Sequence, residues 1–357
     1  MKPLDAVVAI LLSGGAVAVS GCCLVDEDLS NCVETESLTV DYQLRLVTNM
    51  HTELETVLSL DADIKLSTEL TTYLGGVFTD HAHDVDLSFY DTHGDMPILE
   101  HMSETMDASQ SSYTLYLPVR EYMHTSVANI AENQQVTLEG TQFCHSSRLV
   151  QRISSEGLAD PHETGLFTAR KNMDVLSGVD QSFDVRLYMA NAATALVLDP
   201  DADSGFNDIR VEVTGFASSF NIADSTYVFS GSSLADGKDA SVRTQRLQAE
   251  EGGEQCYASV HFPSRDLPES KVIIETEEPF ISESADVALW GWAVYVTLSD
   301  GTVTRSFLGV KTPLKAGQLK IVRAKVHRGG EVTTEDPLVG VSVTLDWQSG
   351  SDHDIEL

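Results

Sequence analysis

The chain has 357 residues and a formal net charge of −33 at pH 7, with 55 acidic residues against 22 basic ones. A surface with this charge repels nucleic-acid phosphates, so the composition excludes a nucleic-acid partner. It also disfavours peripheral contact with anionic lipid headgroups, so membrane attachment would have to come from another feature.

The first 21 residues have the pattern of a bacterial export signal. Lys2 supplies a positive charge, and an apolar run without charge extends from Ala6 to Val19. That run is too short to span a bilayer. The small residues Ser20-Gly21 then precede Cys22, the arrangement cut by lipoprotein signal peptidase. We expect residues 1–21 to be removed and Cys22 to carry lipid; the alternatives are an ordinary secretory signal cut nearby or an uncleaved anchor.

Residues 22–36 form the expected lipidated N-terminal segment, and the other cysteines show no CxxC pair. This spacing excludes a zinc ribbon and a thioredoxin-type redox motif. In an oxidising compartment Cys23 and Cys32 could close a small loop, although four cysteines allow three pairings. The alternative is that most of them remain buried free thiols. The four cysteines are Cys23, Cys32, Cys144 and Cys256.

Residues 37–150 are expected to form an N-terminal β-sandwich. Apolar and polar side chains alternate over 38–46, 85–89 and 113–117, and this period of two is typical of half-buried strands. Pro118 is expected to end the third strand, because proline cannot donate to a ladder.

One short helix is expected between the first two of these strands. The apolar residues Leu66, Leu70, Tyr73 and Leu74 have helical spacing. Gly75-Gly76 is expected to end that helix.

The stretch from about 140 to 181 alternates weakly and mixes Gly, Asp, Pro and Ser. We interpret 151–180 as the connection between two domains. Residues 181–357 are then expected to form a C-terminal β-sandwich. Ser299-Asp300-Gly301 predicts a hairpin turn. Alternation returns over 185–189, 209–213, 256–262, 294–298, 319–326 and 339–347.

Many short strands with turns at this spacing are typical of antiparallel sandwiches. The sequence therefore predicts an all-β chain with two tandem sandwiches and one short helix. It contains no GxSxG, HExxH, P-loop or dinucleotide fingerprint, so it supports no enzyme class, cofactor or small-molecule substrate.

An acidic loop holds the best candidate metal ligands, Asp199, Asp201 and Asp203. Carboxylates at alternate positions of a loop can converge on calcium. The loop departs from an EF-hand because its glycine comes one place late, at Gly205, and Arg210 stands where a bidentate glutamate is expected. We therefore favour a plain acidic turn over a calcium site.

Four histidines fall within about twenty residues and form a second candidate metal cluster. We expect their side chains to splay, because His93 lies in a turn while others flank a strand, so a zinc site is disfavoured. The four are His81, His83, His93 and His101.

Trp290 and Trp292 are two positions apart and would share one face of a strand. They form either a sugar-stacking platform or part of the second core. We favour the core, since aromatic residues with a period of two usually fill one.

Several segments, in their order and spacing, resemble the fimbrial anchor proteins of Bacteroidota, the FimB/Mfa2 family. The resemblance extends over nearly the whole chain beyond the signal. The segments that carry it are the lipid cysteine with residues 27–32, the strand 39–46, the strand and turn 84–94, and residues 113–119, 185–197 and 341–347.

The resemblance implies two transthyretin-like β-sandwich domains and a non-enzymatic role at the base of a surface fimbrium. The lipid would tie the fibre to the outer membrane, and a fimbrial subunit would be the partner, joined by a strand that one chain supplies to the sheet of the other. Residues 26–28 resemble the acidic signals that send lipoproteins of these bacteria to the outer surface.

Residues 348–357 offer only Ile355 and Leu357 as apolar side chains, which makes them a poor donor strand. The chain is therefore expected to accept a strand. Two competing readings are a surface lipoprotein that binds glycans through Trp290 and Trp292, and an enzyme with carboxylates that no motif reveals.

Overall fold

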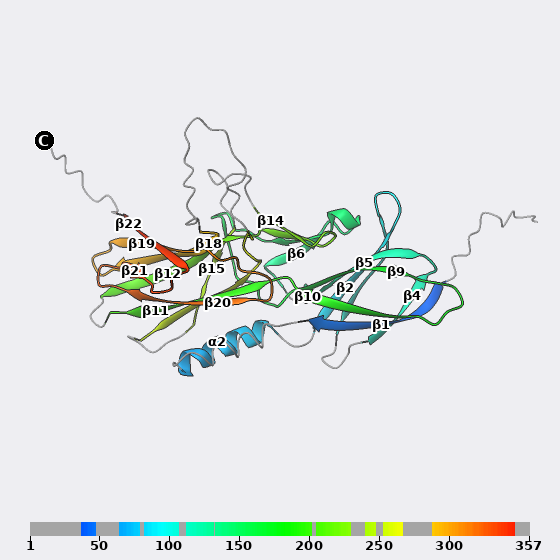
Figure 1. The fold of residues 1–357 in the computed structure, drawn as a ribbon, viewed down its shortest axis with the longest axis horizontal. Coiled ribbons are helices and arrows are strands. Elements are labelled where there is room, and N and C mark those ends of the chain that lie inside the picture. Colours follow the sequence, from blue (N-terminus) through cyan, green and yellow to red (C-terminus); the bar gives the residue numbers. More distant parts are fainter. Residues whose placement is uncertain are drawn as a thin grey trace, which may run out of the picture. The chain divides into compact units, whose positions relative to one another are not determined.

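A computed structural model describes residues 37–47, 64–78, 82–106, 112–131, 133–201, 205–229, 240–247, 253–266 and 288–346. Cys22, Cys23 and Cys32 lie outside these ranges, so lipidation and the disulfide stay predictions. The described residues are mostly strands, as the sequence predicted (Figure 1). No helix in these ranges is long and apolar enough to cross a membrane.

Within the described ranges, one α-helix and one short 3-10 helix stand among the strands. They are β1 (Ser37–Val47), α2 (Ile64–Val77), β2 (Asp84–Asp91), β3 (Ile98–Thr105), β4 (Ser112–Pro118), β5 (Glu121–Ala128), β6 (Val136–Glu139), η2 (Cys144–Ser146), β7 (Arg148–Gln151), β8 (Leu158–Ala159), β9 (Phe167–Asp174), β10 (Ser182–Met189), β11 (Ala192–Pro200), β12 (Phe206–Phe216), β13 (Ser219–Asn221), β14 (Thr226–Val228), β15 (Ala240–Arg243), β16 (Gln245–Leu247), β17 (Gln255–His261), β18 (Trp290–Leu298), β19 (Val303–Val310), β20 (Leu319–Val326), β21 (Val332–Thr333) and β22 (Val339–Asp346).

The N-terminal strands form a seven-stranded sheet in the order β3-β2-β5-β9-β10-β1-β4. The three N-terminal strands predicted from alternation are β1, β2 and β4, and all three belong to this sheet. Most pairs are antiparallel, but β1 runs parallel to β10, with Asp41 opposite Ser182. A parallel pair needs a long connection, and here it spans most of the N-terminal half.

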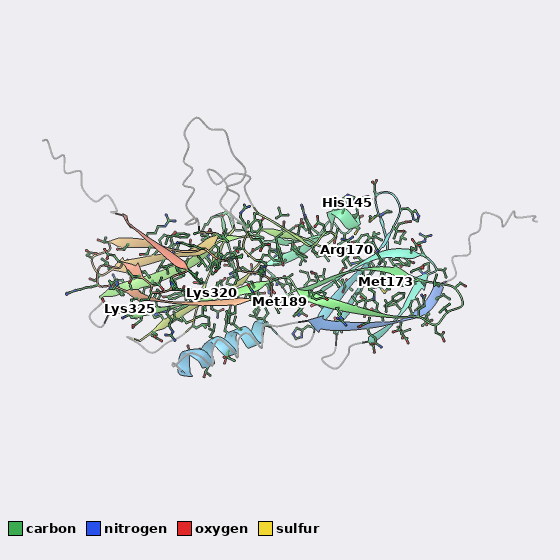
Figure 2. The ribbon with its side chains drawn as sticks, viewed as in Figure 1. His145, Arg170, Met173, Met189, Lys320 and Lys325 are labelled. Carbon is green, nitrogen blue, oxygen red and sulfur yellow. The ribbon has the colours of Figure 1, made fainter. Side chains whose placement is uncertain are left out.

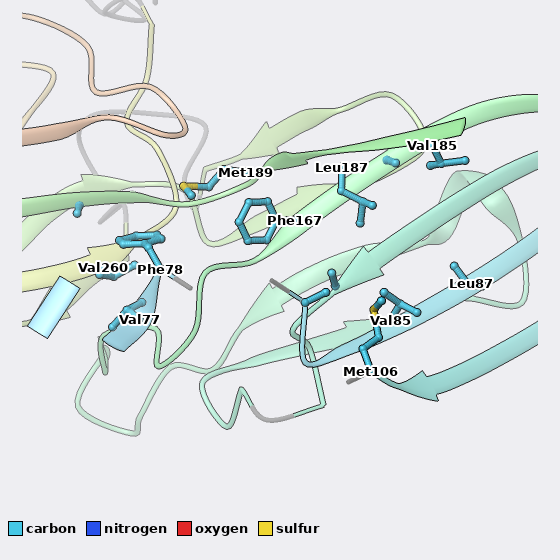
Figure 3. Packing of buried hydrophobic residues seen from close by; sticks show 14 of the residues in the cluster. Val77, Phe78, Val85, Leu87, Met106, Phe167, Val185, Leu187, Met189 and Val260 are labelled. Atoms are coloured by element: carbon cyan, nitrogen blue, oxygen red, sulfur yellow. The ribbon is translucent and has the colours of Figure 1, made fainter. Parts of the chain in front are cut away.

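Helix α2 runs past the glycine pair that was expected to end it. It continues through Gly75 and Gly76 and ends at Val77. A glycine in a helix costs about 1 kcal/mol relative to alanine. Val77 and Phe78 are both buried in the first core, and burying such side chains stabilises by more than that cost. Figure 3 shows both residues in the same cluster as Val260.

The C-terminal strands form a five-stranded sheet, β16-β17-β11-β20-β21, and a six-stranded sheet, β22-β19-β18-β12-β15-β8. The predicted hairpin at 299–301 joins β18 to β19. Gly301 adopts a φ of +85° there, which favours glycine. A further four-stranded sheet has the order β14-β13-β7-β6.

The segment 151–180 is not the plain connection that the sequence predicted. It contains β8 and β9, and β9 pairs with β5 along eight residues. The strand β10, expected to begin the second sandwich, pairs with β1 in the first sheet. The chain leaves that sheet only before β11. Pairing between distant strands, which local alternation does not report, explains the difference.

Candidate functional site

Trp290 and Trp292 lie inside the second core, with exposed fractions of 2% and 0%. Their ring centroids are 4.7 Å apart and the planes meet at 61°. The indole N–H of Trp290 donates to the Thr312 carbonyl oxygen at 2.8 Å. A sugar platform needs exposed, coplanar rings, so the glycan-binding reading through these two residues is wrong, and the expected core role is confirmed.

The candidate metal ligands contact protein groups in different places. His93 Nδ1 lies 3.0 Å from Asp91, and His101 Nε2 lies 2.8 Å from Asp86. His81 falls outside the described residues. Within the described ranges, no group of three or more His, Cys, Asp or Glu side chains is arranged to hold a metal ion.

The acidic loop is described only in part. Asp199 is exposed at the end of β11. The Asp201 carboxylate lies 3.5 Å from Nδ1 of His327, and the Asp201 N–H donates to the Val326 carbonyl oxygen. Asp203 lies outside the described ranges. The preference for a plain turn over a calcium site stays a prediction.

Cys144 and Cys256 are buried free thiols, which confirms that alternative for these two cysteines. Burial raises the pKa of the Cys256 thiol to about 12. A thiol is nucleophilic only as the thiolate, so Cys256 is inert at neutral pH.

Strands β9 and β10 are neighbours in the seven-stranded sheet, yet only two residue pairs join them. Tyr188 pairs with Thr168 and Met189 with Phe167, although each strand has eight residues. On their outer sides β9 pairs with β5 and β10 pairs with β1. The ladder therefore opens into a slot between β9 and β10, inside the sheet.

Strand alternation determines which backbone groups face this slot. Val175 and Arg120 exchange both backbone hydrogen bonds. The backbone N–H and C=O groups of odd-numbered residues in β9 therefore point toward β5. The Asp41 N–H donates to the Gln181 carbonyl oxygen. The backbone N–H and C=O groups of odd-numbered residues in β10 therefore point toward β1. The backbone groups of five even-numbered residues face the slot outside the two paired positions: Arg170, Asn172, Asp174, Ser182 and Arg186.

Two side chains cap backbone carbonyls where the ladder is missing. Lys171 Nζ donates to the Asp184 carbonyl oxygen at 2.7 Å. Gln181 Nε2 donates to the Asp174 carbonyl oxygen at 2.8 Å. Here side chains supply the donors that a neighbouring strand would normally provide.

The sequence itself opposes closure of the slot. Continuing the observed register would place Arg186 directly opposite Arg170. Like charges opposite one another destabilise an antiparallel pair. The two arginines therefore disfavour continuation of the ladder beyond the Tyr188–Thr168 pair.

The slot opens into a groove of about 670 Å³ between β9, β10 and the β13–β14 hairpin. Arg170, Lys171 and Arg186 line it, and no aspartate or glutamate does. Among the described residues none of these three cations forms an ion pair. The groove is therefore lined by positive charges, although the net charge of the chain is −33. Arg170 and Met189 mark its position in Figure 2.

Aromatic side chains complete the groove. Tyr188 is 55% exposed on β10, and the Tyr227 hydroxyl donates to the Ala190 carbonyl oxygen at 2.8 Å. Sequence reasoning missed this site. Arg170 and Lys171 fall in the segment 151–180, which the sequence analysis interpreted as a connection, and their closeness to Arg186 depends on long-range pairing.

No protein-family model matches the sequence, and no curated protein matches it. A candidate adhesin from Bacteroides ovatus has a similar structure, with a TM-score of 0.51 at 10% identity over 89% of this chain and 99% of that one. A candidate cell adhesion protein from Bacteroides eggerthii gives 0.48 at 12% identity over 88% and 97%. The fimbrial anchor protein Mfa2 from Porphyromonas gingivalis gives 0.47 at 8% identity over 86% and 99%. The chain shares its fold with the first of these proteins.

Proposed function

We propose that this chain is a non-enzymatic outer-membrane lipoprotein that anchors a fimbrium to the cell surface through strand-mediated contact with a fimbrillin subunit. The observation that carries the proposal is the fold, which matches a candidate adhesin over 89% of the chain. The lipoprotein pattern ending at Cys22 and the sequence resemblance to fimbrial anchors support the same role.

The lipid supplies the membrane end of the anchor. A lipoprotein cysteine carries two or more acyl chains, the number that stable attachment requires. The strongly acidic chain gains nothing from anionic headgroups, so attachment depends on Cys22. The acidic residues 26–28 support an outward-facing location.

The sheets supply the fibre end. A strand added to a sheet edge is held by a continuous backbone ladder, which gives a long-lived joint. Most of the described part of the chain lies in strands joined by such ladders. In this proposal the anchor accepts a strand from the fimbrial subunit, and residues 348–357, which have few apolar side chains, are not a donor strand.

Mild detergent extraction of cells followed by capture of this protein tests the proposal. A fibre subunit should co-purify from cells that carry the full chain, and also from cells that lack residues 348–357. Capture of the lipidated, folded protein without any fibre subunit would contradict the proposed role.

A further inference from the structure

We propose that the slot between β9 and β10 is where a partner protein inserts an extended segment, and that this segment carries carboxylates that pair with Arg170 and Arg186. The inference rests on the proposed function and locates the joint between the anchor and its partner. It follows from the missing ladder, the charge of the groove and the side chains that cap the slot.

The backbone of the slot is suited to a peptide. Slot-facing N–H and C=O groups recur at every second residue on both β9 and β10. An extended peptide presents matching groups at the same repeat, about 3.3 Å per residue. Since β9 and β10 are antiparallel to each other, an inserted strand pairs parallel with one of them and antiparallel with the other.

The charge of the slot determines which side chains the inserted segment of the partner, here called the guest, can carry. Arg170 and Arg186 are exposed, and they repel one another across the slot. Carboxylates between them would replace that repulsion with two charge-assisted hydrogen-bond contacts. Asp174 and Asp184 lie on the same strands but do not line the groove.

The opposite face of the guest must be apolar. Ala169, Met173, Val185 and Leu187 are the inward residues of β9 and β10, and all four belong to the first core. A strand between them would place every second side chain on that core. The segment therefore alternates acidic and apolar residues.

The side chains of Lys171 and Gln181 satisfy slot-facing carbonyl oxygens before the guest binds. Lys171 and Gln181 occupy the carbonyls of Asp184 and Asp174 until a guest N–H replaces them. Lys171, once released, is a third cation for the guest. An acidic polysaccharide has no backbone N–H groups at the strand repeat, so the missing ladder favours a peptide.

The test uses the full-length protein and two synthetic ten-residue peptides, one alternating valine with glutamate and one alternating valine with lysine. Binding is measured by fluorescence anisotropy. The wild-type protein should bind the acidic peptide and not the basic one. R170E/R186E keeps like charges opposite one another. Its affinity for the acidic peptide should be at least tenfold lower than that of the wild-type protein, and it should bind the basic peptide.

Arg246→Glu is the matched control, because Arg246 is an exposed arginine on β16; this variant should bind as wild type. Circular dichroism verifies that each variant is folded. No binding of the acidic peptide to the wild-type protein would overturn the proposal, as would equal losses in the control and in R170E/R186E.

Hydrogen exchange gives a readout of strand addition itself. The amides of Asn172 and Ser182 should gain protection when the acidic peptide is bound. Arg170→Glu alone places opposite charges across the slot, so these amides should be protected without peptide. Binding of polygalacturonate, an acidic polysaccharide, at the groove with no binding of the peptide would also overturn the proposal.

Fibre attachment to cells that carry the variant distinguishes failure of the slot proposal from failure of the proposed function. Fibres that detach in R170E/R186E, with the protein still lipidated and folded, support the slot as the joint. Fibres that remain attached in R170E/R186E overturn the slot while leaving the anchor role intact. Failure of the anchor role itself would appear as absence of any fibre subunit after capture of the wild-type protein.

Discussion

The hydroxyl of Tyr42 in β1 donates a hydrogen bond to Nε2 of His124 in β5, 82 positions away in the sequence. Nδ1 of the same ring lies 3.0 Å from the Ser88 carbonyl oxygen. Because a carbonyl only accepts, Nδ1 carries the proton and Nε2 accepts from Tyr42. The ring is fully buried and stacks on Phe89, so His124 is held in its neutral form.

Three buried histidines make the fold sensitive to acid. Burial lowers the pKa of His124 and of His162 to about 3 and that of His261 to about 4. In the unfolded chain a histidine has a pKa of about 6.5. Below that pH the unfolded state binds more protons, so stability present near neutral pH is lost as the pH falls from 6.5 toward 4. The loss approaches about 1.4 kcal/mol per pH unit for each histidine.

His124→Gln should reduce this slope. The free energy of unfolding, measured with urea between pH 6.5 and 4.5, should fall less steeply in the variant than in wild type, by up to about 1.4 kcal/mol per pH unit. His145→Gln changes an exposed ring beside Phe143 and should leave the slope as in wild type. Identical slopes for all three proteins would contradict this account.

Gly291 allows the close approach of β18 and β19. A Cβ at this position would overlap the Leu308 carbonyl oxygen and lie 2.8 Å from Cζ of Phe307. Gly291→Ala should therefore destabilise the fold by about 1–3 kcal/mol, the usual cost of overpacking. Gly205→Ala, whose Cβ would meet Ser299 at 3.7 Å, should be nearly neutral. Thermal melting distinguishes the two, and equal melting temperatures would count against the packing described.

The two core tryptophans differ in their hydrogen bonds. Nε1 of Trp290 has Thr312 as its acceptor, whereas Nε1 of Trp292 is buried without a partner among the described residues. Trp290→Phe leaves the Thr312 carbonyl without its donor, while Trp292→Phe removes an unsatisfied donor. Trp290→Phe should therefore cost about 1–2 kcal/mol more in urea unfolding. The reverse order would show that the indole environments are misassigned.

Added calcium should barely change the melting temperature. Asp201 already lies beside His327, and the loop lacks the distal carboxylate that an EF-hand provides. A clear rise at millimolar calcium, abolished by Asp201→Ala, would establish a site through ligand linkage.

Local patterns predicted the strands well because apolar side chains at alternate positions lie on one face of a strand. Val85, Leu87 and Phe89 all lie in the first core, and the Asp300-Gly301 turn joins β18 to β19 as expected. Both features depend on residues that are close in sequence, so the chain itself displays them.

Such local patterns do not predict which distant strands pair with one another. The parallel partnership of Asp41 with Ser182 leaves no local period, and this is why β10 was assigned to the wrong sandwich. The slot was missed for the same reason. Arg170 and Arg186 come together only once β9 and β10 share a sheet, and no spacing within either strand reports that.

In the proposed function, lipid on Cys22 ties a fibre to the cell. The most direct measurement follows the fibre subunit in cell pellet and medium by immunoblotting, for cells that carry Cys22→Ser or the matched neighbour variant Cys23→Ser. We predict that Cys22→Ser sheds fibres into the medium, while Cys23→Ser keeps them on the cells. Fibres retained on Cys22→Ser cells at the level of the Cys23→Ser control would contradict the account.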